Sequence, residues 1–350
     1  MATAASTPPP ALTFPRPIFA AVSPHPFLQA HLSAGKTGSP PARANGRAAH
    51  EFRKPKINTG SLTHCNGSAV VRLGNTSVVC GVRAEILKEQ DVPGANAHSA
   101  AAEADNDDED TEDVEALRLL VPNVELSTGS TPGHIPGNAP STFAQTLITR
   151  IRSLLHSTHL LRSSDLRILH TPLTNPDEPD IEPEVQVRGY WVLYLDIFFI
   201  SIDGNAFDAS WLSILAALQD TLLPHAYFDE EHEGILCSDN PMEARRLRLQ
   251  AFPVSSTFVV FEGQTEDGDE AEGSVEWVLS DPDAFEEGVC RETVSVVVDA
   301  SAGGKGTKDA VVCRIEKSGG GVVDRELVKE LVKRAINQWI EVNELFKGKA

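Results

Sequence analysis

The chain has 350 residues, of which 41% are hydrophobic, and a formal net charge of −20. This length and hydrophobic content predict one large or two small globular domains with a substantial core. The acidic charge excludes a chain-wide basic surface, so counterion release cannot drive strong autonomous RNA binding, although a local basic strip remains compatible with this charge.

The five cysteines are scattered and form no C-x-x-C pair; they are Cys65, Cys80, Cys237, Cys290 and Cys313. An odd, scattered count predicts free thiols in a reducing compartment. No His lies at zinc-finger spacing, and no motif indicates a cofactor, so we expect neither a metal nor a cofactor. No run of about 18 apolar residues is present, so we expect no contact with a membrane through a spanning helix.

The first fifty residues contain no Asp or Glu, a feature of transit peptides. Their proline density, however, argues against the amphipathic helix that a transit peptide requires. We expect a flexible N-terminus over residues 1–10 and an arm with a short helix over 11–40. Ser23 is the expected N-cap of that helix, Pro24 its first residue and Gly35 its end.

The segment from Gly67 to Ile86 predicts two apolar strands joined at Gly74-Asn75, because both residues tolerate the positive φ of a two-residue hairpin turn. Two acidic segments follow, near 88–116 and 262–276. Glu103 to Glu115 carries nine acidic residues and no basic one, so we expect a disordered loop inserted between strands. A functional acidic segment is the alternative.

Apolar residues at helical spacing predict a helix from Phe143 to Leu161, with Arg150 and Arg152 facing outward. A long apolar strand is expected from Val192 to Ile202. An almost wholly apolar, and therefore buried, helix is expected over residues 210–223, with Asp208 as its N-cap.

The last hundred residues predict four strands and a long C-terminal helix capped by Asp324. The strands are expected at Val254–Phe261, Val275–Leu279, Thr293–Asp299 and Ala310–Ile315, and the apolar stripe of the helix consists of Val328, Leu331, Ala335, Trp339, Val342 and Phe346. Strands followed by a helix, twice along the chain, indicate an α+β fold.

Several of these segments together resemble the RNase PH-like family, whose members form the hexameric ring of the RNA exosome. The resemblance is carried by Arg43, Gly46 and Arg47, by Glu51-Phe52-Arg53, by the hairpin at Gly74, and by residues 190–223. It implies a two-lobed β-α fold (ribosomal protein S5 domain 2-like) over residues 41–350. It also makes Arg43, Arg47 and Arg53 candidate RNA-binding residues; a solvated basic turn is the alternative.

In active family members, a Gly-rich turn before the buried helix carries Thr or Ser and an Arg, which hold the attacking phosphate. The corresponding positions here are Asp203, Gly204, Asn205, Ala206, Phe207 and Asp208. Phe207 stands where the Arg is expected, and two carboxylates at this turn would repel phosphate by about 1 kcal/mol or more each. A second element, an acid expected near Cys290, is also missing, because Val289, Cys290 and Arg291 occupy that position.

The resemblance therefore implies a non-catalytic subunit of the exosome core ring that supports 3′-to-5′ RNA processing and degradation. Its partners would be other RNase PH-like subunits in a hetero-hexameric ring, S1/KH cap subunits, and RNA threading through the assembled complex. Its expected locations are the nucleus, nucleolus and cytoplasm. Two alternatives are an active phosphorolytic 3′-to-5′ exoribonuclease with an unorthodox phosphate site, and an acidic interaction protein unrelated to RNA.

The first acidic segment generates a prediction about stability. Residues Glu103 to Glu115 offer too little apolar surface to offset the entropy of ordering them. Deletion of residues 96–113 should therefore leave the melting temperature within a few degrees of the full chain, measured by circular dichroism. A large drop in melting temperature, or loss of soluble protein, would show that the segment packs.

Overall fold

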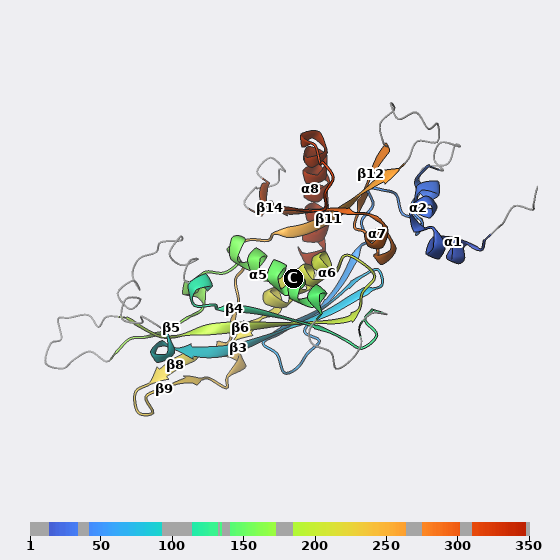
Figure 1. Cartoon of the computed structure of the whole chain (residues 1–350). Coiled ribbons are helices and arrows are strands. Elements are labelled where there is room, and N and C mark those ends of the chain that lie inside the picture. Colours follow the sequence, from blue (N-terminus) through green and yellow to red (C-terminus); the bar gives the residue numbers. More distant parts are fainter. Residues whose placement is uncertain are drawn as a thin grey trace, which may run out of the picture.

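The computed structural model describes residues 14–33, 42–92, 114–131, 134, 141–172, 185–263, 275–301 and 310–347. Two sheets lie on either side of a layer that contains the helices α5 and α6 (Figure 1). We call the larger sheet with α5 and α6 the first lobe, and the smaller sheet with α7 and α8 the second lobe. This arrangement confirms the predicted α+β, two-lobed fold.

The first sheet has the strand order β1-β2-β3-β6-β4, with β5 also paired to β6. Its strands are β1 (Pro55–Thr59), β2 (Gly67–Leu73), β3 (Thr76–Lys88), β4 (Leu120–Leu126), β5 (Arg167–His170) and β6 (Gln186–Ser201). The predicted hairpin is confirmed: Leu73 faces Thr76, and Gly74 has a φ of +61°, as in type II′ turns. Strand β6 pairs antiparallel with β3 and parallel with β4, which the sequence did not indicate.

The second sheet is wholly antiparallel and has the order β12-β11-β13-β14. Its elements are β11 (Val254–Gly263), β12 (Val275–Ser280), α7 (Ala284–Val289), β13 (Glu292–Asp299), β14 (Val311–Ser318) and α8 (Arg325–Lys347). The predicted cap of α8 is present, since Leu327 N donates to Asp324 Oδ1 at 2.7 Å. Leu331 and Ala335 of α8 pack against this sheet, while Trp339, Val342 and Phe346 join the core of the first lobe.

Helix α6 (Ala206–Asp220) joins the two lobes, because every residue from Ala206 to Leu218 is buried. It packs on β2 and β3 on one side and on β11 on the other. The Nε1–H of Trp211, which is fully buried, donates to Pro253 O at 2.8 Å and so ties the helix to the entry of β11.

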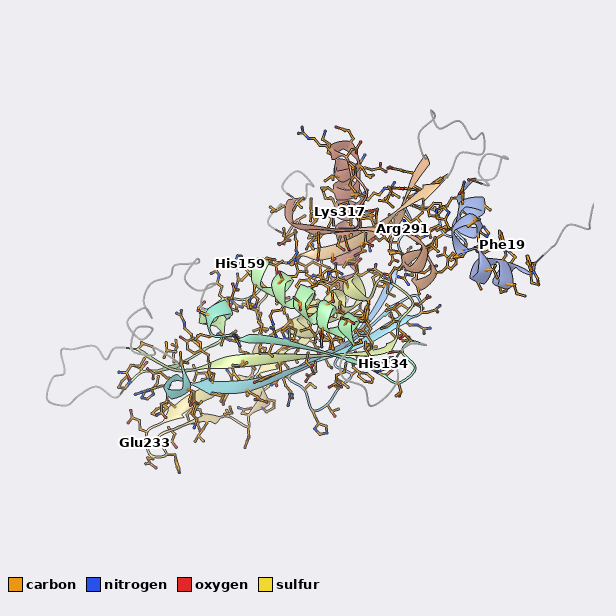
Figure 2. All side chains as sticks on the ribbon, in the orientation of Figure 1. Phe19, His134, His159, Glu233, Arg291 and Lys317 are labelled. Carbon is orange, nitrogen blue, oxygen red and sulfur yellow. The ribbon has the colours of Figure 1, made fainter. Side chains whose placement is uncertain are left out.

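The bounds of the two inner helices differ from the predicted ones. Helix α6 begins at Ala206, and the last two residues predicted to be helical form the short strand β7 (Leu222–Leu223), paired with β10 (Arg245–Arg246). Helix α5 (Thr142–Ser157) ends before Leu161, because His159 adopts a φ of +46°. Between β7 and β10 along the chain, β8 (Ala226–Asp229) and β9 (Gly234–Cys237) form a hairpin with Glu233 at its tip (Figure 2).

The N-terminal arm contains two helices, α1 (Arg16–Val22) and α2 (Pro24–Ser33). Helix α2 was predicted, although its expected end at Gly35 and the expected flexible residues 1–10 lie outside the described residues. Only one short helix was expected in this arm, so α1 was not predicted. Pro17 lies in the first turn of α1, where a backbone N–H would have no hydrogen-bond partner within the helix, so proline is tolerated there. Leu28 and Leu32 are buried against Val259 and Phe261 of the second lobe.

Only the ends of the two acidic segments are described. Val92 and Val114, at the two ends of the first segment, are buried. Glu262 and Glu276 pair across β11 and β12, so the second insertion is shorter than predicted. Among the described helices, none is long and apolar enough to span a membrane.

A buried ion pair joins the loop before β1 to the second lobe. The guanidinium of Arg43 is fully buried and donates to both carboxylate oxygens of Glu286, with 2.7 Å from Nε to Oε1. The same group donates to the backbone carbonyls of Ser280 and Asp281. Glu286 also closes a capping box with Asp283 at the start of α7. Arg43 therefore has a structural role: it holds the loop before β1 against the second lobe.

This ion pair generates a stability prediction. Glu286→Gln keeps the shape of the side chain but leaves the Arg43 charge buried without its counter-ion, so the free energy of unfolding should fall by about 3–5 kcal/mol. Guanidinium denaturation at neutral pH measures the change. Arg72→Ala, which removes an exposed Arg of β2, serves as the control and should cost less than about 0.5 kcal/mol. A loss below about 1 kcal/mol for Glu286→Gln would contradict the structural role of the pair.

Candidate functional site

The turn from β6 into α6 is the position at which the family would hold phosphate. Gly204 has a φ of +72°, and a Cβ there would meet backbone atoms of Asp283 and Ala284 at 2.4–2.6 Å. Asn205 follows in the left-handed region with a φ of +50° and occupies the N-cap position without a capping hydrogen bond from its side chain. The turn is therefore pressed against the N-terminus of α7, and this contact requires glycine.

Asp208 was predicted to cap α6, and this was wrong, because it lies within the first turn and points to β11. It is 4% exposed, and its carboxylate accepts hydrogen bonds from Ser255 Oγ at 2.6 Å, from Thr257 N at 2.8 Å and from Asn205 Nδ2 at 2.8 Å. Burial raises the pKa of Asp208, and these hydrogen bonds only partly oppose that rise. The carboxylate serves as an anchor between the two lobes.

Phe207 occupies the position at which the family carries an Arg, and its ring is 5% exposed. The guanidinium of Arg150 lies over this ring, with Cζ 4.0 Å from the ring centroid. Arg150 also donates to Glu316 Oε2 and to Ser295 Oγ, each at 3.1 Å. The expectation that Arg150 faces outward was therefore wrong. It is a cation near the turn, but an aromatic face and an acid of the second lobe already hold it.

The backbone N–H at the start of α6, a typical anion-binding group, is also occupied. Asn205 N donates to Glu287 Oε1 at 2.7 Å. Loss of water around this carboxylate, with Asp208 and Asp281 nearby, raises the pKa of Glu287 to about 7, although much of the residue remains exposed. An internal acid thus takes one of the donors that a phosphate would need.

The arginines predicted to bind RNA lie beside this turn, and carboxylates of the protein hold them. Arg53 grips Asp281 with two hydrogen bonds of 2.7 Å and donates to Asp203 O at 2.8 Å. Arg47 lies 3.2 Å from the same carboxylate. Burial alone would raise the pKa of Asp281, but Arg53 and the Asn205 amide hold it below its usual value.

RNA binding by Arg43 is excluded in this structure because its guanidinium is fully buried. For Arg47 and Arg53, whose side chains are 14% and 9% exposed, RNA binding stays a prediction.

The second catalytic element of the family also has no acid here. Cys290 ends α7 and is 9% exposed, and burial raises the pKa of its thiol to about 12, so it is not a nucleophile at neutral pH. Arg291 follows it on the second lobe (Figure 2). Within the described ranges, no group of three or more His, Cys, Asp or Glu side chains could hold a metal ion.

The structure brings the six turn residues together with Arg53, a contact that the sequence did not indicate, and it adds further partners that sequence reasoning missed. Glu287 and Arg150 are the most important of these. Glu287 was assigned no role from the sequence, and Arg150 was assigned to the outer face of its helix. No pattern in the sequence indicates that Arg150 would stack on Phe207.

Residues 51–224 match the model of the 3′ exoribonuclease family, domain 1. The exosome complex component rrp43 of Schizosaccharomyces pombe is 27% identical over 324 residues, which cover 93% of this chain and 95% of that protein. The Rrp42 component of Methanothermobacter thermautotrophicus is 26% identical over 303 residues, covering 85% of this chain and 86% of that protein. An Archaeoglobus fulgidus exosome structure with RNA bound to the active site shares the fold, with a TM-score of 0.60, 23% identity and coverage of 94% of this chain and 99% of that one. Residues 51–224 therefore form an RNase PH-like domain of the 3′ exoribonuclease family.

Proposed function

We propose that this chain is a non-catalytic subunit of the core ring of an RNA exosome and supports 3′-to-5′ RNA processing and degradation by completing the ring. Rrp43 of Schizosaccharomyces pombe is the relative to which we assign it, because the likeness runs along nearly the whole length of both chains. Its neighbours would be other RNase PH-like subunits and S1/KH cap subunits, with RNA passing through the assembled complex. The nucleus, nucleolus and cytoplasm are its proposed locations.

One observation carries the non-catalytic assignment: the protein itself fills the anion site. Glu287 occupies the N–H of Asn205, Phe207 replaces the expected Arg, and Asp208 adds a buried carboxylate one residue later. A phosphate entering this turn would meet acids instead of a cationic fork, and each such contact at a partly screened distance costs about 1 kcal/mol or more. Enzymes catalyse phosphoryl transfer mainly by electrostatic stabilisation of the transition state. These replacements remove the cationic and N–H groups that would provide it.

Exposed apolar side chains on two separate faces of the protein support the ring assignment. On the outer face of the first sheet, the side chains of Phe198 and Ile200 in β6 are 41% and 49% exposed. On the second lobe, β14 is an edge strand in which Val311 is 58% and Ile315 is 46% exposed. Two separate apolar faces suit two different neighbours in a closed heterologous ring.

We predict that the purified protein releases no nucleoside diphosphates from single-stranded RNA in the presence of inorganic phosphate. Thin-layer chromatography of end-labelled RNA measures the products, and an active phosphorolytic ribonuclease in parallel shows that the assay works. Phosphate-dependent release that disappears in the Asp203→Ala variant would overturn the non-catalytic assignment. Asp203 is suited to this test because it lies in the turn but outside the buried part of α6.

We predict that the protein expressed alone aggregates or self-associates, whereas co-expression with another RNase PH-like subunit gives a soluble 1:1 species. Permanent interfaces commonly exceed about 2,000 Å² and are apolar at their centres, so leaving them uncovered favours association. Multi-angle light scattering measures the masses. A stable 37.7 kDa monomer that pairs with no RNase PH-like subunit would contradict the ring assignment.

A matched pair of variants refines the association test. Phe198→Asp should weaken the 1:1 species by placing a charge in the exposed face of β6. Val322→Asp adds the same charge at a residue that is 88% exposed in the loop before α8, and it should leave pairing unchanged. Equal effects of the two variants would show that the face of β6 is not an interface.

A further inference from the structure

A short basic segment stands out on this acidic chain and has no role in the site described above. Residues 245–248 read Arg-Arg-Leu-Arg, and all three arginines are exposed while Leu247 is 5% exposed. The segment begins in β10, which pairs with β7 directly after α6. Leu247 N donates to Thr221 O at 3.0 Å, so the backbone is fixed to the end of α6 and the guanidinium groups project from a rigid base.

Beside this segment lies a groove of about 480 Å³, within the range of pockets that bind ligands. Arg246 and Arg248 line it together with Leu247 and Leu249; α6 and β1 form its walls, and Phe346 of α8 contributes to its lining. Asp220 is the acid in this lining, and backbone N–H groups of Gly60 and Ser68 already hold its carboxylate at 3.0 and 3.1 Å. The groove therefore combines apolar walls with cations on one edge.

Within the described part of the chain, the guanidinium groups of Arg246 and Arg248 form no hydrogen bond or ion pair, whereas that of Arg245 donates to the backbone carbonyl of Asp165. These arginines are not needed to cap the C-terminus of α6. Thr221 already donates to the carbonyls of Ala217 and Leu218, and the effect of the helix dipole falls off within the last turn. On a chain with a net charge of −20, two exposed arginines without an ion-pair partner among the described residues give this edge a local positive charge that an acidic partner would complement.

We propose that this groove binds a short acidic peptide segment, with apolar side chains among its acids, from a partner protein. The arginines would take carboxylates with forked hydrogen bonds, and the space above Leu249 and Ala216 would take the apolar side chains. RNA fits less well, because single strands are held by stacking on exposed aromatic rings, and the aromatic residue of this lining, Phe346, is 8% exposed. This proposal does not depend on the ring assignment.

The test uses the full-length protein and a fluorescein-labelled random copolymer of Glu and Tyr as the acidic-apolar probe, with anisotropy as the readout. Polyglutamate and a single-stranded oligouridylate are measured in parallel. We expect the copolymer to bind more tightly than either, and added salt to weaken binding because the contacts are partly ionic. The double variant Arg246→Glu/Arg248→Glu should lower affinity at least tenfold, and Leu249→Asp should lower it through the apolar wall.

The control is Arg72→Glu/Arg325→Glu, which reverses two exposed arginines elsewhere on the surface and gives the same net charge. It should leave the affinity within about twofold. Circular dichroism melting verifies that all variants fold. Three results would each overturn the proposal: equal losses in the two double variants, equal binding of polyglutamate and the copolymer, or an oligouridylate affinity that matches the copolymer and is lost with Arg246 and Arg248. The last of these would identify a nucleic-acid surface instead.

Discussion

The carboxylate of Asp208 is the constraint on which the arrangement of the two lobes depends. A charge at the start of a fully buried helix is tolerated only if hydrogen bonds replace its lost water, and here β11 and the turn supply all of them. Those bonds fix the position of α6 against the second sheet, and Trp211 extends the same seam by one more turn. The lobes are therefore joined by polar contacts at the helix start and by apolar packing further along.

In the same neighbourhood, acids of the protein occupy the groups that would otherwise bind an external anion. Asp281, whose pKa lies below its usual value, binds Arg53, and the Glu287 carboxyl group accepts a hydrogen bond from the N–H of Asn205. The donors of the turn thus stay satisfied, as buried donors must. Asn205 shows the limit of this substitution, since its side-chain oxygen is buried and lacks a hydrogen-bond partner among the described atoms.

Sequence patterns predicted half of the described strands and the three long helices α5, α6 and α8, because period-two and helical spacing of apolar residues report burial directly. They placed the start of α6 four residues late, since Ala206 to Ala209 carry an acid and little hydrophobic contrast. They also treated Asp208 and Arg150 by their usual surface roles, as a cap and a solvated cation. Those errors share one cause: the partners of both side chains, on β11 and at Phe207, are distant in sequence, and no local rule indicates such contacts. The acidic character of the turn was predicted correctly, because that prediction depends only on which residues occupy the turn.

The stacking of Arg150 on Phe207 determines what mutation at this turn could achieve. Arginine at position 207 would remove the ring beneath Arg150 and set two guanidinium groups against each other, while Asp208, which the lobes need, would remain. Replacement of Asp208 by a hydroxyl residue would remove the carboxylate that Ser255 and Thr257 of the second lobe bind. A cationic phosphate site therefore cannot be built at positions 207 and 208 without losing contacts that hold the two lobes together.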